Sequence, residues 1–245
     1  MAAKAAKKAK PKAGPASDSR VGVWSEIGKL RRVLVCQPDL AHQRLTPENS
    51  AELLFDDVIW LAQARRDHFD FVSKMEDHGV EVYDLQDCLA EVLKDHLARA
   101  WVLDRRLTDY LVGPNISLEM RPWLEEMDAA TLARYLIGGI AFHDVPKDVA
   151  GPFLSTFAET EPAGFVIAPL PNTQFMRDNS SWIFHGVTLN PMYWPARQPE
   201  TLLTTAVYNF HPAFENEEYN VWLGDPDGNP YDHGATTLEG GDVMP

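Results

Sequence analysis

The apolar positions in the first third of the chain follow a strand, a helix and a second strand. Residues 30–36 form a β-branched, apolar run that Pro38 ends, which is typical of a strand. Thr46 followed by Pro47 predicts the start of a helix that ends at Gly79. Its apolar face is Leu54, Val58, Leu61, Phe71 or Val72, and Met75. Residues 80–85 alternate as the next strand, so the pattern predicts an α/β unit.

The pattern changes to helical spacing between residues 88 and 160. Segments 89–103, 117–127 and 129–140 all carry apolar residues at helical intervals, and Ser117 and Asp128 are suitable N-caps. Little alternation interrupts them, which predicts a helical insertion over 88–160. His96, His143 and Asp144 lie here without metal-ligand spacing, and we interpret them as surface residues.

Strand patterns return after residue 160. Residues 165–170 predict a buried strand that ends at Pro171, and residues 181–184 and 187–190 predict a hairpin around a His185-Gly186 turn. A helix over 200–210, a short strand over 221–223 and a turn cluster over 225–230 follow.

Charge is distributed unevenly between the N-terminus and the body of the chain. Residues 1–20 hold six of the 22 basic residues and one of the 36 acidic ones, so 16 basic and 35 acidic residues leave the body at −19. The Ala/Lys-rich residues 1–20 predict a disordered basic tail. An acidic body repels phosphate backbones, so nucleic acid is not an expected partner.

Cysteine usage and hydropathy bear on the compartment. Cys36 and Cys88 give no disulfide framework, which suits a reducing compartment. The longest apolar run, residues 135–142, is too short to cross a bilayer, and the N-terminus has no secretory apolar region. We therefore expect a cytoplasmic protein that does not bind membranes.

Polar residues are crowded between the predicted strands at 165–170 and 181–184. Asn172, Arg177 and Asp178 lie in this loop. Charges held between buried strands need partners or a ligand, because lone buried charges are costly. On the residues alone, a functional site and a structural ion-pair network explain the loop equally well.

Hydrolysis of a guanidinium group is one chemistry that these residue types could serve. Carboxylates would grip the planar cation, a thiolate would attack its central carbon, and a histidine would act as general acid and base. Asp178, Glu239 and Asp242 could provide the carboxylates, and Arg197 and Asn172 could hold an α-amino-acid end.

Other chemistries find less support in the sequence. Cys36, Cys88 and His185 are unconvincing as nucleophile or base, because each fits a structural position better. Serine-hydrolase elbows, phosphate-binding loops and compact metal-ligand spacings were not found, so no cofactor or metal is expected.

The chain resembles the arginine deiminase family from about residue 21 to residue 245. Two motifs carry most of the resemblance, Pro-Asn-x-x-Phe-x-Arg-Asp at 171–178 and Glu-Gly-Gly-Asp at 239–242. Further matching stretches are residues 28–33, 42–47, 52–57, 135–139 and 188–193. The resemblance implies hydrolysis of L-arginine to L-citrulline and ammonia through a cysteine thiouronium intermediate. It also implies part of a pentein-type five-bladed α/β propeller, formed by 21–87 and 161–245, with 88–160 inserted as a helical bundle.

Residue roles follow from the resemblance position by position. Asp178 matches the carboxylate that grips the guanidinium, and Glu239 matches the acid that orients the catalytic histidine. Asn172 and Arg197 match residues that hold the amino-acid end of the substrate, and Asp242 is a further substrate-binding candidate. Leu54 and Phe175 match residues that line the pocket.

The family draws its catalytic histidine, its nucleophilic cysteine, a second aspartate and another arginine from a second half that these 245 residues lack. We therefore expect the chain to be truncated before those groups, inactive alone and prone to associate, with full-length relatives forming homo-oligomers. The alternatives are a non-catalytic arginine-binding or dimerising fragment, another guanidino-modifying pentein such as an amidinotransferase or dimethylarginine hydrolase, or a decayed gene product.

Overall fold

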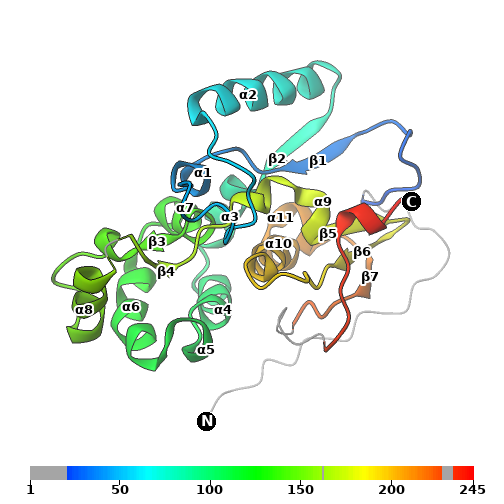
Figure 1. Cartoon of the computed structure of the whole chain (residues 1–245). Coiled ribbons are helices and arrows are strands. Elements are labelled where there is room, and N and C mark those ends of the chain that lie inside the picture. Colours follow the sequence, from blue (N-terminus) through cyan, green and yellow to red (C-terminus); the bar gives the residue numbers. More distant parts are fainter. Residues whose placement is uncertain (1–20, 162, 228–233) are drawn as a thin grey trace, which may run out of the picture.

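The computed structural model describes residues 21–161, 163–227 and 234–245 (Figure 1). The predicted disordered tail, 1–20, and part of the turn cluster at 225–230 lie outside the described residues. The described chain is a mixed α/β structure with small sheets, and none of these sheets closes on itself within the described ranges.

The first strand–helix–strand unit is present as predicted. β1 (Arg32–Val35) and β2 (Glu81–Asp84) form a parallel pair in which Val33 lies opposite Val82, and α2 (Leu61–Asp77) connects them. Gly79 follows α2 with a φ of +74°, the left-handed conformation that glycine adopts without strain.

The predicted start of this helix at Thr46 is wrong. α1 (Leu40–Gln43) precedes a series of turns, and α2 begins only at Leu61. Thr46 and Asn49 instead close a turn on each other, with the Asn49 side chain accepting from the Thr46 amide at 2.8 Å. Such local side-chain bonds offer the backbone an alternative to the helix, which explains the late start.

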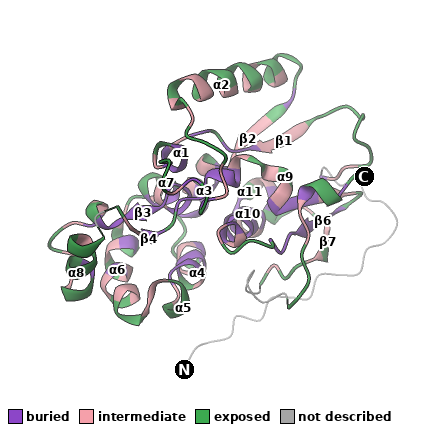
Figure 2. Ribbon diagram, in the orientation of Figure 1, coloured by how far each residue is buried: buried purple, intermediate pink, exposed green. Residues whose placement is uncertain are grey.

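Helix α2 is more exposed than its amphipathic pattern predicts. None of its 17 residues, all of which the structure describes, is buried, and the Phe69 side chain is 69% exposed (Figure 2). The helix lies along one side of the molecule over β2, apart from the other helices. Its apolar residues therefore form an exposed surface rather than part of the core.

The helical region contains more and shorter helices than expected. Its helices are α3 (Leu85–Val92), α4 (His96–Arg106), α5 (Asp109–Val112), α6 (Pro114–Glu126), α7 (Ala129–Gly138) and α8 (Pro152–Thr160). The predicted single helix over 89–103 is interrupted because Asp95 caps α4, accepting from the amides of Leu97 and Ala98.

The two predicted N-caps in this region had different outcomes. Asp128 caps α7 by accepting from the Thr131 amide at 3.0 Å, as predicted. Ser117 lies inside α6, which begins at Pro114, so that prediction is wrong. Its hydroxyl donates to the Leu107 carbonyl at 3.1 Å, which links α6 back to the end of α4.

The core lies where α3 packs against α7 and where α10 (Gln198–Phe210) packs against α3 and α4. Fully buried side chains from these helices include Leu85, Leu89, Leu103, Leu132, Leu136 and Leu203. The proposed domain boundary at residue 88 falls within α3, and the division into propeller part and insertion stays a prediction.

The remaining strands form two small sheets. β3 (Ile140–Ala141) pairs antiparallel with β4 (Phe165–Ile167). β5 (Ser180–Ile183) and β6 (Gly186–Leu189) form the predicted hairpin, and β7 (Asn220–Leu223) adds to β6 in parallel. α11 (Pro212–Glu215) lies between α10 and β7 in the sequence.

The hairpin turn differs from the prediction in one detail. Ile183 pairs with Gly186, so the turn residues are Phe184 and His185, and Phe184 rather than glycine takes the positive φ of +51°. Gly186 is needed for another reason, because a Cβ there would lie 2.5 Å from the Trp222 indole nitrogen on β7.

Among the described residues, no helix combines the length and the apolar character needed to cross a bilayer.

Helix α4 allows a direct test of where the core lies. Leu103→Ala removes a fully buried side chain and is expected to lower the free energy of unfolding by about 2–5 kcal/mol. Leu97→Ala on the same helix removes a side chain that is 67% exposed and is expected to change it by about 0.5 kcal/mol or less. Urea denaturation of both variants measures the difference, and equal effects would contradict the described core.

Candidate functional site

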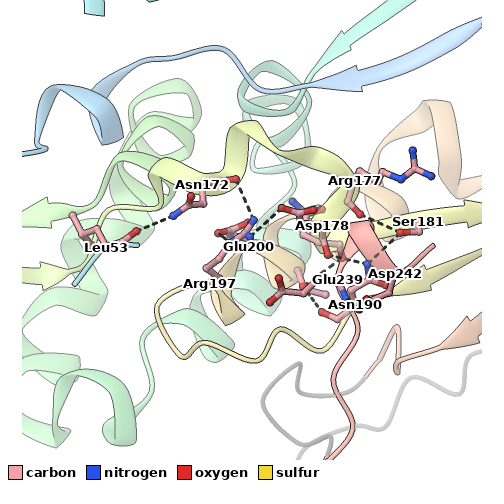
Figure 3. A network of polar contacts seen from close by, with 12 residues as sticks. Leu53, Asn172, Arg177, Asp178, Ser181, Asn190, Arg197, Glu200, Glu239 and Asp242 are labelled. Carbon is pink, nitrogen blue, oxygen red and sulfur yellow. Dashed lines mark hydrogen bonds and ion pairs between the residues drawn. The ribbon is translucent and has the colours of Figure 1, made fainter. Parts of the chain in front are cut away.

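The polar loop predicted from the sequence becomes two short helical turns between β4 and β5. η2 (Pro171–Gln174) and α9 (Met176–Asn179) place Asn172 and Asp178 on the side of the loop that faces the start of α10. The last described segment, with η3 (Gly240–Asp242), packs against α9. Three segments far apart in the sequence therefore meet here (Figure 3).

The guanidinium of Arg197 lies at the centre of this meeting point. Its Nε and Nη2 donate to the two oxygens of Glu200 at 2.9 and 3.0 Å, which is a bidentate pair. Its Nη1 donates to Asp178 Oδ2 at 3.0 Å, and Nη2 also donates to the Asn172 carbonyl at 3.3 Å. One arginine thus connects the loop at 171–179 with α10.

The two carboxylates around Arg197 differ in their burial. Glu200 is fully buried, whereas the Asp178 side chain is 26% exposed. Burial raises the pKa of the Glu200 carboxyl although Arg197 opposes this, and the charges of Asp178 and Glu239 raise it further. Burial would lower the pKa of Arg197, but the bonds to Glu200 and Asp178 outweigh it and raise that pKa.

Asn172 is held by the segment that precedes α2. Its side-chain amide donates to the Leu53 carbonyl at 2.8 Å. The next residue, Leu54, takes a φ of +57°, a left-handed conformation that is rare for a residue with a branched side chain. The structure thus brings the predicted pocket residue Leu54 next to a direct partner of Asn172.

Glu239 and Asp242 approach the site from the other side. Glu239 lies near enough to raise the pKa of Glu200 through its charge. Asp242 is exposed and accepts from the Glu239 backbone amide at 3.4 Å, which closes the turn of η3. Gly240 lies against the Arg177 backbone, where a Cβ would be 2.5 Å from the carbonyl oxygen.

The side chains of Arg177 and Asp178 point to different sides of the loop, although the two residues are adjacent in the sequence. Arg177 points away from Arg197 and pairs with Glu26, with Nη1 donating to Oε2 at 3.0 Å, and it also donates to the Val243 carbonyl. The structural interpretation therefore fits Arg177. Asp178 is the charged residue of the loop that turns toward the interior of the site.

The aromatic residues around the site are largely exposed. Phe175, at the junction of η2 and α9, is 48% exposed. Trp194 is also exposed and packs edge-on against Tyr193. Trp182 instead contacts Tyr208 and Tyr219 edge-on and belongs to the support of the sheet. His185 packs edge-on against Trp222, in agreement with its structural interpretation.

Sequence reasoning missed Glu200, which it placed only at the start of the predicted helix over 200–210. The Arg197-x-x-Glu200 spacing was the available signal, because residues three apart at the start of a helix can face each other. It also missed Asn190, whose side-chain amide donates to the Asp178 carbonyl at 2.8 Å and so holds the backbone of the loop.

Two polar residues of the helical region, His143 and Asp144, differ in their exposure and contacts. His143 is exposed, as interpreted from the sequence, but Asp144 is not a simple surface residue. Asp144 pairs with Arg44 and accepts from the Ala141 amide at 2.7 Å, because the short strand β3 ends beside it. Within the described ranges, no group of three or more His, Cys, Asp or Glu side chains is placed to hold a metal ion.

Neither thiol is placed as a nucleophile. Cys36 and Cys88 are both buried and unpaired with each other. Burial raises the pKa of the Cys88 thiol to about 12, with Asp84 adding to the effect, and burial with nearby Asp84 and Glu200 also raises the pKa of Cys36. Both groups therefore remain protonated at neutral pH.

The reactivity of Cys36 and Cys88 tests whether their thiols are buried. Both cysteines of the native chain are expected to react with a disulfide reagent roughly a thousand-fold more slowly than in denaturant, because reaction needs an accessible thiolate. The measurement is release of the chromophore at pH 8 with and without guanidinium chloride. Rapid labelling of one cysteine in the native chain would contradict its described environment.

The two glycines of the Glu-Gly-Gly-Asp motif form a matched pair. Gly240→Ala is expected to detach the last segment from α9, because the new methyl group meets the Arg177 backbone. Gly241→Ala is expected to be tolerated, because a Cβ there meets no atom within 4 Å. Amide hydrogen exchange over residues 238–243 measures this, and equal protection in both variants would count against the packing.

One known protein family matches the part of the chain that forms this site. The sequence model described as arginine deiminase aligns with residues 51–245, which include Asn172, Asp178, Arg197 and Glu200. Its range begins before the Leu53–Asn172 contact and covers both motifs around Arg197. The chain therefore belongs to the arginine deiminase family.

Proposed function

We propose that this chain carries the substrate-gripping half of an arginine deiminase site, which hydrolyses L-arginine to L-citrulline and ammonia. The enzyme class is a hydrolase that acts on a guanidino C–N bond. Family membership supports the reaction, and the arrangement around Asp178 supports the assignment of the site.

The contact between Asp178 and Arg197 is the observation that carries the proposal. Asp178 accepts a hydrogen bond from a guanidinium group at 3.0 Å, and the group is the same as that of the substrate. Its partial exposure means that a second guanidinium could reach it from solvent. A carboxylate on a short helical turn, fixed by Asn190, is well suited to orient a planar cation.

The remaining roles are proposed from the family motifs. Arg197 and Asn172 would hold the α-carboxylate and α-amino end, and Leu54 and Phe175 would line the pocket. Glu239 would orient a catalytic histidine, and Asp242, which closes the turn at η3, would be a further substrate-binding residue.

The chemical steps require a thiolate that neither Cys36 nor Cys88 can supply, since both are buried and protonated. In the proposed reaction a thiolate forms a bond to the guanidinium carbon, and ammonia leaves with a proton from the histidine. Water then attacks, the carbon–sulfur bond breaks, and L-citrulline is released. This chain would bind and orient the substrate for those steps.

In the described conformation Asp178 and Arg197 pair directly with each other. The guanidinium and carboxylate carbons of extended L-arginine lie roughly 7 Å apart. Asp178 and Arg197 are in direct contact, so they cannot each hold one end of the substrate without moving apart. Substrate binding is therefore expected to exchange the internal guanidinium at Asp178 for that of the ligand.

We extend the proposal to the fold and the assembly. Residues 21–87 and 161–245 would form part of a pentein propeller with 88–160 inserted, and full-length relatives would be homo-oligomers in the cytoplasm. The exposed apolar face of α2 and the open edges of the two-stranded sheet β1–β2 are consistent with a larger assembly.

A second candidate is a non-catalytic, arginine-binding chain. The burial of both thiols favours it, because binding alone needs no nucleophile. It shares the site at Asp178 with the first candidate and differs only in the absence of turnover. The family match favours a deiminase over an amidinotransferase or dimethylarginine hydrolase.

Citrulline formation distinguishes the two candidates. The chain alone is expected to be inactive, and addition of the separately produced second half of a full-length family member is expected to give activity. Asp178→Ala in the same mixture is expected to lower kcat/KM by at least about 100-fold, because the guanidinium loses its charged partner. Arg121→Ala, at an ion pair on helix α6 that shares no contact with Arg197 or Asp178 among the described residues, serves as the control.

The outcomes are separable. Turnover by the chain alone would contradict the proposal and point to Cys36 or Cys88. Binding of L-arginine without turnover in any mixture would favour the non-catalytic candidate. Absence of both binding and turnover in a cooperatively folded chain would reject both.

A further inference from the structure

Glu200 is the permanent partner of Arg197, whereas Asp178 is the exchangeable one. Glu200 makes two hydrogen bonds to Arg197 from a position three residues further along the same helix start. It is fully buried, so no ligand can approach it without disrupting α10. Asp178 makes a single bond, comes from a different element and is partly exposed.

The charges of the groups around Arg197 show why a second carboxylate is needed. With Arg197 and both carboxylates ionised, the group carries one net negative charge. A ligand guanidinium arriving at Asp178 places a second cation beside Arg197. With Glu200 present, two carboxylates face two cations, whereas without it a single carboxylate would have to serve both unless the ligand brings a carboxylate of its own to Arg197. Two partly buried cations that share one carboxylate repel each other strongly.

The remaining groups around Arg197 cannot replace Glu200. The Asn172 carbonyl accepts one bond from Nη2 but carries no charge. Glu239 acts on the group only through its charge, and within the described ranges no hydrogen bond joins it to Arg197. Glu200 is thus the charged group that can stay on Arg197 while Asp178 leaves.

We propose that Glu200 is a positioning residue that keeps Arg197 neutralised and fixed, so that Asp178 becomes available to the guanidinium of the substrate. The inference rests on the proposed function, because it assumes that Asp178 receives the substrate. In this role Glu200 lets the guanidinium of the substrate bind to Asp178 but does not itself contact that guanidinium.

Two ligands of equal charge distinguish the positioning role of Glu200 from a purely structural role. L-Arginine and n-butylguanidinium both carry a net charge of +1, but only L-arginine brings a carboxylate that can replace Asp178 on Arg197. In Glu200→Gln, n-butylguanidinium is therefore expected to lose at least about ten-fold in affinity, and L-arginine less than about three-fold. NMR titration of the whole chain gives both dissociation constants.

Matched variants control for charge and for folding. Glu200→Asp keeps the charge and is expected to retain the affinity for n-butylguanidinium within about three-fold of the wild type. Glu215→Gln, on the neighbouring helix α11 and exposed, is expected to change neither affinity. An equal loss for both ligands in Glu200→Gln, or a larger loss for L-arginine, would overturn the proposal.

If Glu200→Gln does not fold, a measurement on the unmodified chain still tests the proposal. The Arg197 Nε–H group donates to Glu200, so its NMR signal is expected to stay protected from exchange when L-arginine saturates the site. Loss of that protection would mean that the ligand displaces Glu200, which contradicts the proposal. If the wild-type chain binds neither ligand, the proposed function fails instead, which is a distinguishable result.

Discussion

The buried guanidinium of Arg197 is the interaction on which the arrangement of the site depends. It joins the loop at 171–179 to the start of α10, and α10 in turn packs into the core formed with α3 and α4. A buried cation is stable only with paired carboxylates and satisfied hydrogen bonds. The positions of Asp178, Glu200 and the Asn172 carbonyl are therefore mutually constrained, and each fixes a different part of the backbone.

Three further contacts extend this constraint to other parts of the described chain. The Asn172 side chain holds the Leu53 carbonyl, which belongs to the turns before α2. Arg177 holds Glu26 near the beginning and the Val243 carbonyl near the end. Because neighbouring residues of one loop reach these segments in different directions, the site consists of residues from at least three parts of the chain that packing alone would not align.

The contrast between the helical core and the strand edges also bears on function. The fully buried leucines lie among α3, α4, α7 and α10, and the site is built at the start of α10. α2 and the two-stranded parallel sheet β1–β2 leave apolar side chains and sheet edges exposed. Parallel strands are normally covered on both faces, and here α2 packs over β2 while Phe69 and Phe71 on α2 stay exposed.

The sequence by itself determined the local elements and the family. The strand–helix–strand unit, the Asp128 cap, the hairpin after the polar loop and the helix α10 are all encoded by periodicity and capping residues, which act over a few positions. The family motifs likewise pointed to Asn172 and Arg197, which the structure joins to Asp178 through hydrogen bonds of Arg197. Tertiary structure decided the rest. The late start of α2, the turn at Phe184 and the separation of Arg177 from Asp178 each depend on partners that periodicity does not encode. Glu200 became a site residue only when folding buried it against Arg197, because burial, not residue type, turns an ordinary acidic first turn into an obligatory counterion.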